Sequence, residues 1–96
     1  MLPKGIPVSK LNNLVEYLRK RGIWAERHSY SIRMIYRGAI VASLHLYPGY
    51  SEAVLRLYGD EESNNVIEEA VREALATFLP EYVTIIRRLS KSVNEG

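Results

Sequence analysis

The spacing of hydrophobic residues changes twice along the chain. Over residues 11–18 apolar side chains recur every three or four positions, which is the spacing of one face of an α-helix. Over residues 23–58 they alternate with polar side chains, as in a β-strand with one buried face. Over residues 66–78 the helical spacing returns. The pattern therefore predicts a helix, a group of strands and a second helix.

Residues that favour helix ends flank both helical segments. Ser9 stands before the first apolar stripe, so we expect its hydroxyl to cap the first helix, and Gly22 is a natural stop. Asp60 stands before the second stripe, where its carboxylate can accept hydrogen bonds from free amides of the first turn. Pro80 is expected to end the second helix, because proline cannot continue it.

Four segments of alternating pattern lie between the two helices, and their connections are short. Their sequences are IWAERHS, IRMIYR, AIVASLHLY and EAVLRLYG. Arg37-Gly38 and the segment YPGYS are expected to form tight turns, because glycine permits positive φ and proline presets its own. Parallel neighbours would need a crossover helix, so the short connections predict an antiparallel meander.

The segment 81–92 fits two structures. Its apolar residues keep helical spacing and Pro80-Glu81 suits a helix start, whereas the β-branched run VTII favours a strand. We expect a third helix, with a last strand as the alternative. The predicted fold class is α+β in the order α-β-β-β-β-α-α, with a three- to four-stranded antiparallel meander sheet and the helices packed on one face.

Alternation assigns each strand residue to one of two faces of the sheet. The face toward the helices is expected to hold Ile32, Met34, Tyr36, Ile40, Ala42, Leu44, Leu46, Ala53, Leu55 and Leu57. The opposite face is expected to hold Arg33, Ile35, Arg37, Val41, Ser43, His45, Tyr47, Glu52, Val54, Arg56 and Tyr58, joined by Trp24, Glu26 and His28 if the first strand has the matching register.

The composition is that of an ordinary globular domain. Of 96 residues, 47% are hydrophobic and 25% are charged, and we expect one domain over residues 1–96, with an arm at 1–8 and a tail at 91–96. No apolar run approaches the ~20 residues of a membrane span, and no secretory signal is recognisable. An intracellular, cytoplasmic protein without a membrane partner is therefore expected. Cysteine and glutamine are absent, a thermophile-like bias that also excludes disulfides and thiolate catalysis.

The formal net charge of +2 is unevenly distributed. Residues 1–59 contain nine Lys and Arg against three Glu, whereas residues 60–96 contain four against eight Asp and Glu. A basic half can attract an anionic partner, and a basic and an acidic half can also pair with another copy of the chain.

The outward face of the sheet predicts a nucleic-acid-binding surface. Arginine side chains can fork onto phosphates, and aromatic rings can stack on bases. The basic residues of the first helix add to the positive charge. The candidate contact residues are Arg33, Arg37, Arg56, Tyr47, Tyr58, His45, Lys10, Arg19, Lys20 and Arg21. Contacts of this kind depend on phosphate charge and stacking, so binding is expected to tolerate different base sequences.

Other interpretations of these residues remain open. Arginine and tyrosine are also common on ordinary solvent-exposed sheets, and a basic helix end also satisfies the helix dipole. Ile35, Val41 and Val54 lie among the polar outward residues, and an apolar patch of this kind usually contacts another chain. We therefore expect a homodimer. It would either bind nucleic acid or act as a protein-interaction or structural subunit that self-associates through this face.

The sequence contains no motif that defines catalysis or metal binding. His28 and His45 could meet across neighbouring strands, but a zinc or manganese site needs three or four convergent ligands. Double-stranded RNA-binding domains share the order helix, strands, helix, but they carry lysines where this second helix starts with GDEESNN. Metal-dependent nucleases of the restriction-enzyme type need a Glu-x-Lys signature, which is absent. We expect a non-catalytic protein without cofactor or metal, with a metal-dependent enzyme as the weaker alternative.

Overall fold

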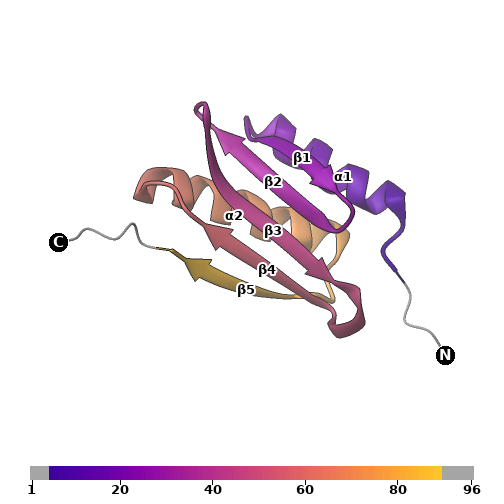
Figure 1. Ribbon diagram of the computed structural model, residues 1–96. Helices are drawn as coiled ribbons and strands as arrows, with labels where there is room; N and C mark the ends of the chain where they lie inside the picture. The colour runs from indigo at the N-terminus through magenta and orange to yellow at the C-terminus, as the bar shows by residue number, and fades with distance from the viewer. Residues whose placement is uncertain (1–4, 90–96) are drawn as a thin grey trace.

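The protein folds as two helices and a five-stranded sheet (Figure 1). The computed structural model describes residues 5–89; half of the predicted arm, residues 1–4, and the whole predicted tail lie outside them. In chain order the elements are α1 (Val8–Lys20), β1 (Trp24–His28), β2 (Ser31–Tyr36), β3 (Ala39–Tyr47), β4 (Glu52–Leu57), α2 (Glu61–Phe78) and β5 (Val83–Arg88). A single 3₁₀ turn, Pro48–Tyr50, joins β3 to β4.

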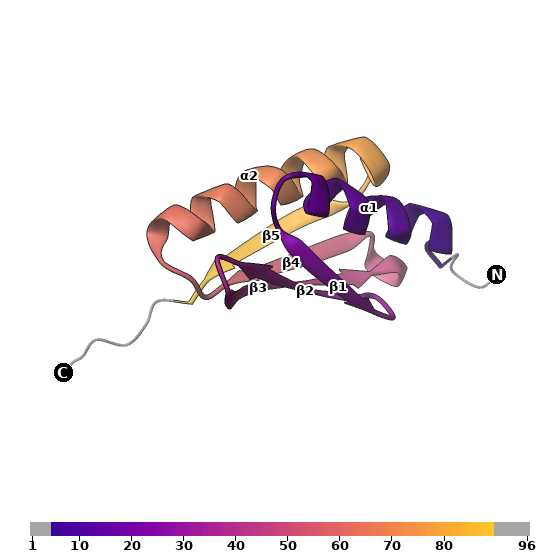
Figure 2. The ribbon, with the colours of Figure 1, turned by 90° about the horizontal axis from the view of Figure 1, so that it is seen from above.

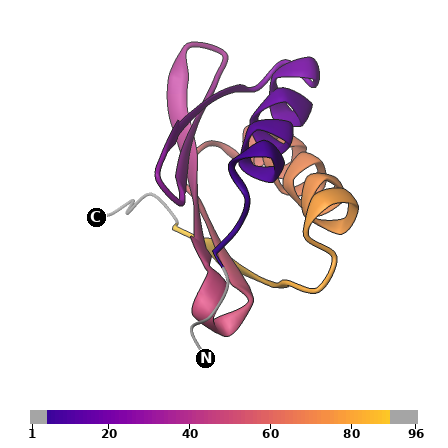
Figure 3. The ribbon, with the colours of Figure 1, turned by 90° about the vertical axis from the view of Figure 1, so that its right-hand side faces the viewer.

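The strands lie in the sheet in chain order. β1 to β4 form the expected antiparallel meander, and β5 pairs with β4 in the parallel direction. Figures 2 and 3 show α1 and α2 side by side on one face of the sheet, with the other face uncovered by either helix. The predicted α+β class, with helices on one face of an antiparallel meander, is confirmed. Neither helix within residues 5–89 is long and apolar enough to cross a membrane.

The prediction of a third helix over residues 81–92 is wrong for the part that the structure describes. Val83–Arg88 forms β5, held to β4 by hydrogen bonds such as Val83 N–H to Ser51 O (2.9 Å). The β-branched run in this segment suits a strand, and α2 supplies the crossover that a parallel neighbour requires. Pairing with β4 satisfies backbone groups along an edge that a helix would leave open. Residues 90–92 of the predicted helix lie outside the described range.

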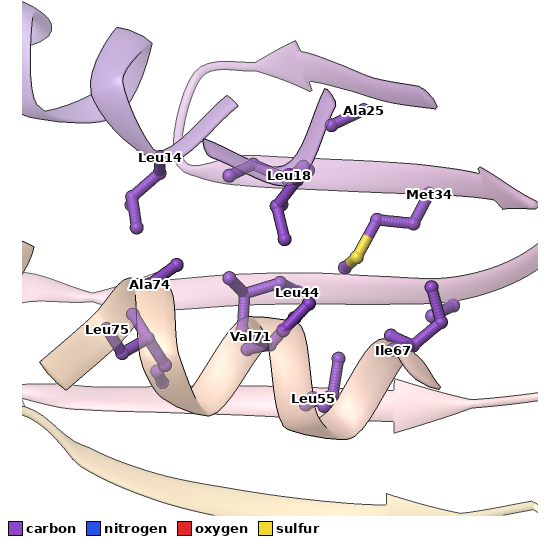
Figure 4. Packing of buried hydrophobic residues seen from close by; sticks show 14 of the residues in the cluster. Leu14, Leu18, Ala25, Met34, Leu44, Leu55, Ile67, Val71, Ala74 and Leu75 are labelled. Carbon is purple, nitrogen blue, oxygen red and sulfur yellow. The ribbon is translucent and has the colours of Figure 1, made fainter. Parts of the chain in front are cut away.

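The core lies between the two helices and the sheet (Figure 4). The apolar stripes of both helices are buried as their spacing predicts, for example Leu14 on α1 and Ile67 on α2. They pack against the inward side chains of the central strands, including Met34, Leu44 and Leu55, whose exposure is at most 1%. Since each such side chain contributes about 1.5–3 kcal/mol when fully buried, this layer is the main source of stability.

The helix starts differ from one another. At α2, the carboxylate of Asp60 accepts a hydrogen bond from Ser63 N–H at 2.8 Å, which confirms the predicted cap. At α1 the prediction that Ser9 caps the helix is wrong, because the helix begins at Val8, two residues earlier than a Ser9 cap requires, and Pro7 occupies the cap position. The Pro7 carbonyl accepts the first helical hydrogen bonds, from Lys10 and Leu11 N–H at 3.0 and 3.2 Å.

A bulge in β3 exchanges the predicted directions of Ile40 and Val41. Met34 pairs with Ala42 but Ile35 pairs with Ile40, so Val41 is an extra residue on β3. Ile40 is 54% exposed, whereas Val41 is 5% exposed and belongs to the core. The predictions that Ile40 points inward and Val41 outward are therefore wrong. A two-residue turn with positive φ at Arg37 and Gly38 sets the register on one side of the bulge.

Room for the inward Val41 comes from Gly59. A Cβ atom on Gly59 would lie only 3.0 Å from Cγ1 of Val41, so a larger residue there would force the Val41 side chain to shift by a few tenths of an ångström. The side-chain amide of Asn64 holds this glycine by accepting from its N–H and donating to its carbonyl, both at 3.0 Å. The connection from β4 to α2 therefore fixes the place where Val41 turns into the core.

Candidate functional site

The sheet face opposite the helices is the candidate site, and we call it the open face. Its members follow from the strand registers and the burial pattern. They are Trp24, Glu26, His28, Ser31, Arg33, Ile35, Ile40, Ser43, His45, Tyr47, Glu52, Val54, Arg56, Tyr58, Val83, Ile85 and Arg87.

One row of side chains crosses all five strands of the open face. Its members are consecutive cross-strand partners: Glu26, Arg33, Ser43, Arg56 and Arg87. Neighbouring strands lie about 4.8 Å apart, so the row is about 19 Å long. It contains three arginines and one carboxylate. We call these three arginines the arginine row.

The carboxylate of the row is engaged at the β1 edge. Arg33 donates to Glu26 at 2.7 Å, and the indole N–H of Trp24 donates to the other carboxylate oxygen at 3.1 Å. The hydrogen bond from Arg33, followed by that from Trp24, holds the pKa of Glu26 below its usual range. Glu26 therefore remains ionised and offsets the charge of Arg33, while the other two arginines lie towards the opposite edge.

Arg56 and Arg87 concentrate positive charge at the β4–β5 side. They are direct partners in the parallel pairing of the two strands, so two guanidinium groups extend from adjacent backbone positions on the same face. Like charges in this arrangement repel. The guanidinium of Arg56 also lies 3.5 Å from Nδ1 of His45, so the imidazole ring lies beside the arginine row. An anion bound between the two arginines would remove the repulsion.

Aromatic rings flank the arginine row. His45 and Tyr47 lie nearly parallel on β3, with ring centroids 6.5 Å apart. The hydroxyls of Tyr58 and Ser43 are 2.7 Å apart, which holds the Tyr58 ring close to the row. Trp24 is 50% exposed at the β1 edge. The open face therefore combines fixed cations with ring surfaces, the two elements that single-stranded nucleic acid requires.

The open face also exposes apolar side chains. Trp24, Ile40 and Val83 are each at least half exposed, at 50%, 54% and 61%, and Tyr47 is 39% exposed. Val54 lies at the centre of the face, where its neighbours leave only 8% of it exposed. Phosphate binding does not require exposed apolar side chains, so these residues point to a further kind of contact on this face.

The structure brings together five of the predicted contact residues on the open face: Arg33, Arg56, His45, Tyr47 and Tyr58. The prediction that Arg37 faces outward with them is wrong. It lies in the β2–β3 turn, its guanidinium sits 5.4 Å from the ring of Tyr36, and it contacts Glu62 of α2 at 3.4 Å. A positive φ at this position redirects the side chain out of the alternation.

The basic residues of α1 have different environments. Arg19 donates to the carbonyl of Ala25, and Arg21 pairs with Glu73 of α2. Both therefore hold α1 to its neighbours. Lys10 and Lys20 are exposed, and no ion pair involves them within residues 5–89. None of the four is a member of the open face.

The apolar patch predicted from Ile35, Val41 and Val54 is present in part. Ile35 and Val54 are on the open face, and the buried Val41 is replaced there by Ile40. Arg87 and Val83 were missed because their segment was assigned to a helix. The β-branched run VTII at residues 83–86 was the signal that could have placed them.

The two histidines do not form a metal site. His28 pairs with Ser31, which in turn pairs with His45, so the histidines are two strands, or about 10 Å, apart. Across residues 5–89, no cluster of three or more His, Cys, Asp or Glu side chains could hold a metal ion.

No protein-family model matches the chain, no curated protein matches its sequence, and no solved structure matches it.

Proposed function

We propose that the protein binds nucleic acid through the open face, with little preference for base sequence. The observation that carries this proposal is the arginine row, in which Arg33, Arg56 and Arg87 share one line of side chains across the sheet face that neither helix covers. Guanidinium groups bind phosphate oxygens with two parallel hydrogen bonds and stay charged at any physiological pH. The repulsion between Arg56 and Arg87 is relieved when a phosphate lies between them.

A single strand fits the open face better than a duplex. The major groove of a duplex admits a helix or a two-stranded ribbon, not the flat side of a five-stranded sheet. Unpaired bases, by contrast, can stack on rings such as Tyr47 and Trp24, and each stacked base contributes about 1–3 kcal/mol. Phosphate contacts and stacking read no base edges, so different sequences should bind with similar affinity.

The single tryptophan of the chain provides the test, because it lies on the proposed surface. A labelled single-stranded oligonucleotide is titrated while Trp24 fluorescence and oligonucleotide anisotropy are recorded at several salt concentrations. Arg56 and Arg87 make no ion pair within residues 5–89, and two phosphates neutralised by them predict a slope of log affinity against log salt of about −1.4. Fluorescence quenching should follow the same curve as anisotropy.

Arg87→Ala and Arg88→Ala form a matched pair for this test. The two residues are neighbours on β5, but Arg87 is on the open face while Arg88 binds Glu68 and Asn65 of α2. Arg87→Ala should weaken binding and reduce the salt slope, whereas Arg88→Ala should leave both unchanged. Equal effects of the two variants, or no binding at low salt, would refute the proposal.

Self-association through the open face is a second candidate function, supported by the exposure of Trp24, Ile40 and Val83. In this case the protein is an interaction subunit and two copies cover each other's apolar residues. Ile40→Glu should then abolish the dimer, and the wild type should show no affinity for nucleic acid.

A further inference from the structure

The two edges of the sheet differ in whether their backbone groups are engaged. At the β1 edge, Arg19 reaches from α1 and donates through Nε and Nη2 to the carbonyl of Ala25, at 3.1 and 2.9 Å. Its guanidinium also lies against the ring of Trp24. A bulky charged group therefore occupies the outer side of β1, a common way to stop another strand from pairing there.

The β5 edge carries no comparable block within residues 5–89. Val83 and Leu89 donate their N–H groups to Ser51 and Leu57 at 2.9 Å, so the odd-numbered residues of this segment face β4. The N–H and C=O groups of Thr84 and Ile86 therefore point away from the sheet, where no described strand pairs with them. The run from Val83 to Ile86 contains no proline, glycine or charge and is β-branched throughout.

α2 leaves the outer side of β5 accessible. A depression of about 140 Å³ lies between this helix and the strand, lined by residues that include Arg72, Ala76, Tyr82 and Thr84. A second, of about 350 Å³, lies further along the same side, next to Glu68 and Arg88. Both depressions therefore lie beside β5 on the helix side of the sheet.

We propose that β5 pairs with β5 of a second copy of this chain, antiparallel about a two-fold axis close to Ile85, to form a continuous ten-stranded sheet. The occupant is a second copy because one free edge and one blocked edge permit a closed pair and prevent an open chain of subunits. About a two-fold axis, Thr84 of each copy also lies opposite Ile86 of the other, so the outward N–H and C=O groups of these residues can pair with one another.

Charge selects the register of this pair. If Arg87 of one copy lay opposite Arg87 of the other, two guanidinium groups would face each other directly, which is unfavourable. With Ile85 opposite Ile85, Val83 lies opposite Arg87 and the centre of the interface is apolar. The arginines of both copies then flank the axis on the open face. The pairing itself does not depend on nucleic-acid binding, and it would double the surface proposed for that function.

Because the chain contains no cysteine, a single introduced cysteine can form a disulfide only with the same cysteine of another copy. Ile85→Cys and Glu26→Cys each place one thiol on the open face, in the middle of β5 and β1 respectively. Because Thr84 and Ile86 would make the hydrogen bonds, Ile85 would face Ile85 of the second copy as a non-hydrogen-bonded pair. The Cα atoms of such a pair are about 4.5 Å apart, within the range that a disulfide bridges under mild oxidation. We expect a covalent dimer from Ile85→Cys and monomer from Glu26→Cys. Equal cross-linking of the two variants, or none, would overturn the pairing.

Light scattering on the unmodified chain measures the same association without a thiol. An interface of one strand edge is small, so the mass should rise from that of the 11.0 kDa chain to twice that value between about 1 µM and about 1 mM. Thr84→Pro removes an N–H that β4 does not use and should keep the chain monomeric, while Thr84→Val should still dimerise. Circular dichroism establishes that both variants fold.

Three results would contradict the proposal. The first is a wild-type chain that stays monomeric at the highest concentration, which would assign the β5 edge to a different partner. The second is a Thr84→Pro variant that folds and still dimerises. The third is a dimer lost in Ile40→Glu but kept in Thr84→Pro, which would place the contact on the open face. If Thr84→Pro does not fold, the cysteine pair decides the question.

Discussion

The guanidinium carbon of Arg19 lies 4.0 Å from the centre of the Trp24 ring, and the same group donates two hydrogen bonds to the carbonyl of Ala25. One side chain therefore joins α1 to β1, supports the exposed tryptophan and occupies a strand edge. A cation on an indole face contributes about 0.5–1 kcal/mol at an exposed site, and each hydrogen bond a similar amount.

Removing this side chain should change association as well as stability. We expect Arg19→Ala to lower the free energy of unfolding by about 1–2 kcal/mol and to form assemblies larger than a dimer, since both edges would then be free. Urea unfolding and light scattering measure the two effects. Arg19→Lys should show an intermediate result, because an ammonium cannot fork onto a carbonyl and stack flat on a ring. An Arg19→Ala protein with unchanged assembly would contradict the edge-blocking role.

Glu73 should make stability depend on pH in the acid range. The hydrogen bond from Arg21, followed by that from Tyr17, lowers the pKa of Glu73 in the folded chain. A carboxylate of this kind stabilises the fold above its unfolded pKa of about 4.3, and that stabilisation is lost as the pH falls through the folded value. Glu73→Gln should therefore lose stability at neutral pH and show a flatter curve below about pH 4.5.

The control for Glu73 is Glu81→Gln, an exposed position outside the contact of Arg21 with α2. It should reproduce the wild-type pH profile of thermal unfolding. If the unfolding temperature of Glu73→Gln changed with pH in parallel with that of the wild type down to the lowest pH, the contact with Arg21 and Tyr17 would not stabilise the folded chain.

Substitutions of Asn64 should lower the stability of the fold. It is 7% exposed, and its amide makes two hydrogen bonds to the backbone of Gly59. Asn64→Ala leaves the partly buried N–H and carbonyl of Gly59 without these partners, so we expect the free energy of unfolding to fall by about 1–3 kcal/mol. Asn64→Asp keeps the acceptor but not the donor and should lose less. Denaturant titration ranks the free energies of unfolding of the wild type and the two variants. An Asn64→Ala variant as stable as the wild type would be inconsistent with a stabilising role for the two hydrogen bonds to Gly59.

The bulge in β3 predicts opposite tolerance at two adjacent positions. Val41→Ala removes buried methyl groups beside Gly59 and should cost about 2 kcal/mol. Ile40→Thr changes an exposed side chain and should stay within about 0.5 kcal/mol of the wild type. If thermal unfolding gave the reverse order, the register between Met34 and Ile35 would be incorrect.

Much of the binding face could be predicted from local pattern. Arg33, His45 and Arg56 lie on the open face because alternation holds over the regular parts of β2, β3 and β4. Arg37 was misplaced because it occupies a turn residue with positive φ, where alternation ends. Arg87 was missed because the preference of residues 83–88 for strand over helix depends on a pairing partner outside the segment.

The sequence by itself determined the two amphipathic helices, the cap at Asp60, the antiparallel meander and the direction of most strand side chains, because these depend on residues close together in the chain. Only the tertiary structure decided the outcome at three places. Val41 turned inward because Gly59 left room for it. The last segment became β5 because β4 offered unpaired backbone groups. Arg19 occupies the β1 edge because α1 lies beside β1, whereas no strand within residues 5–89 pairs with the outer side of β5.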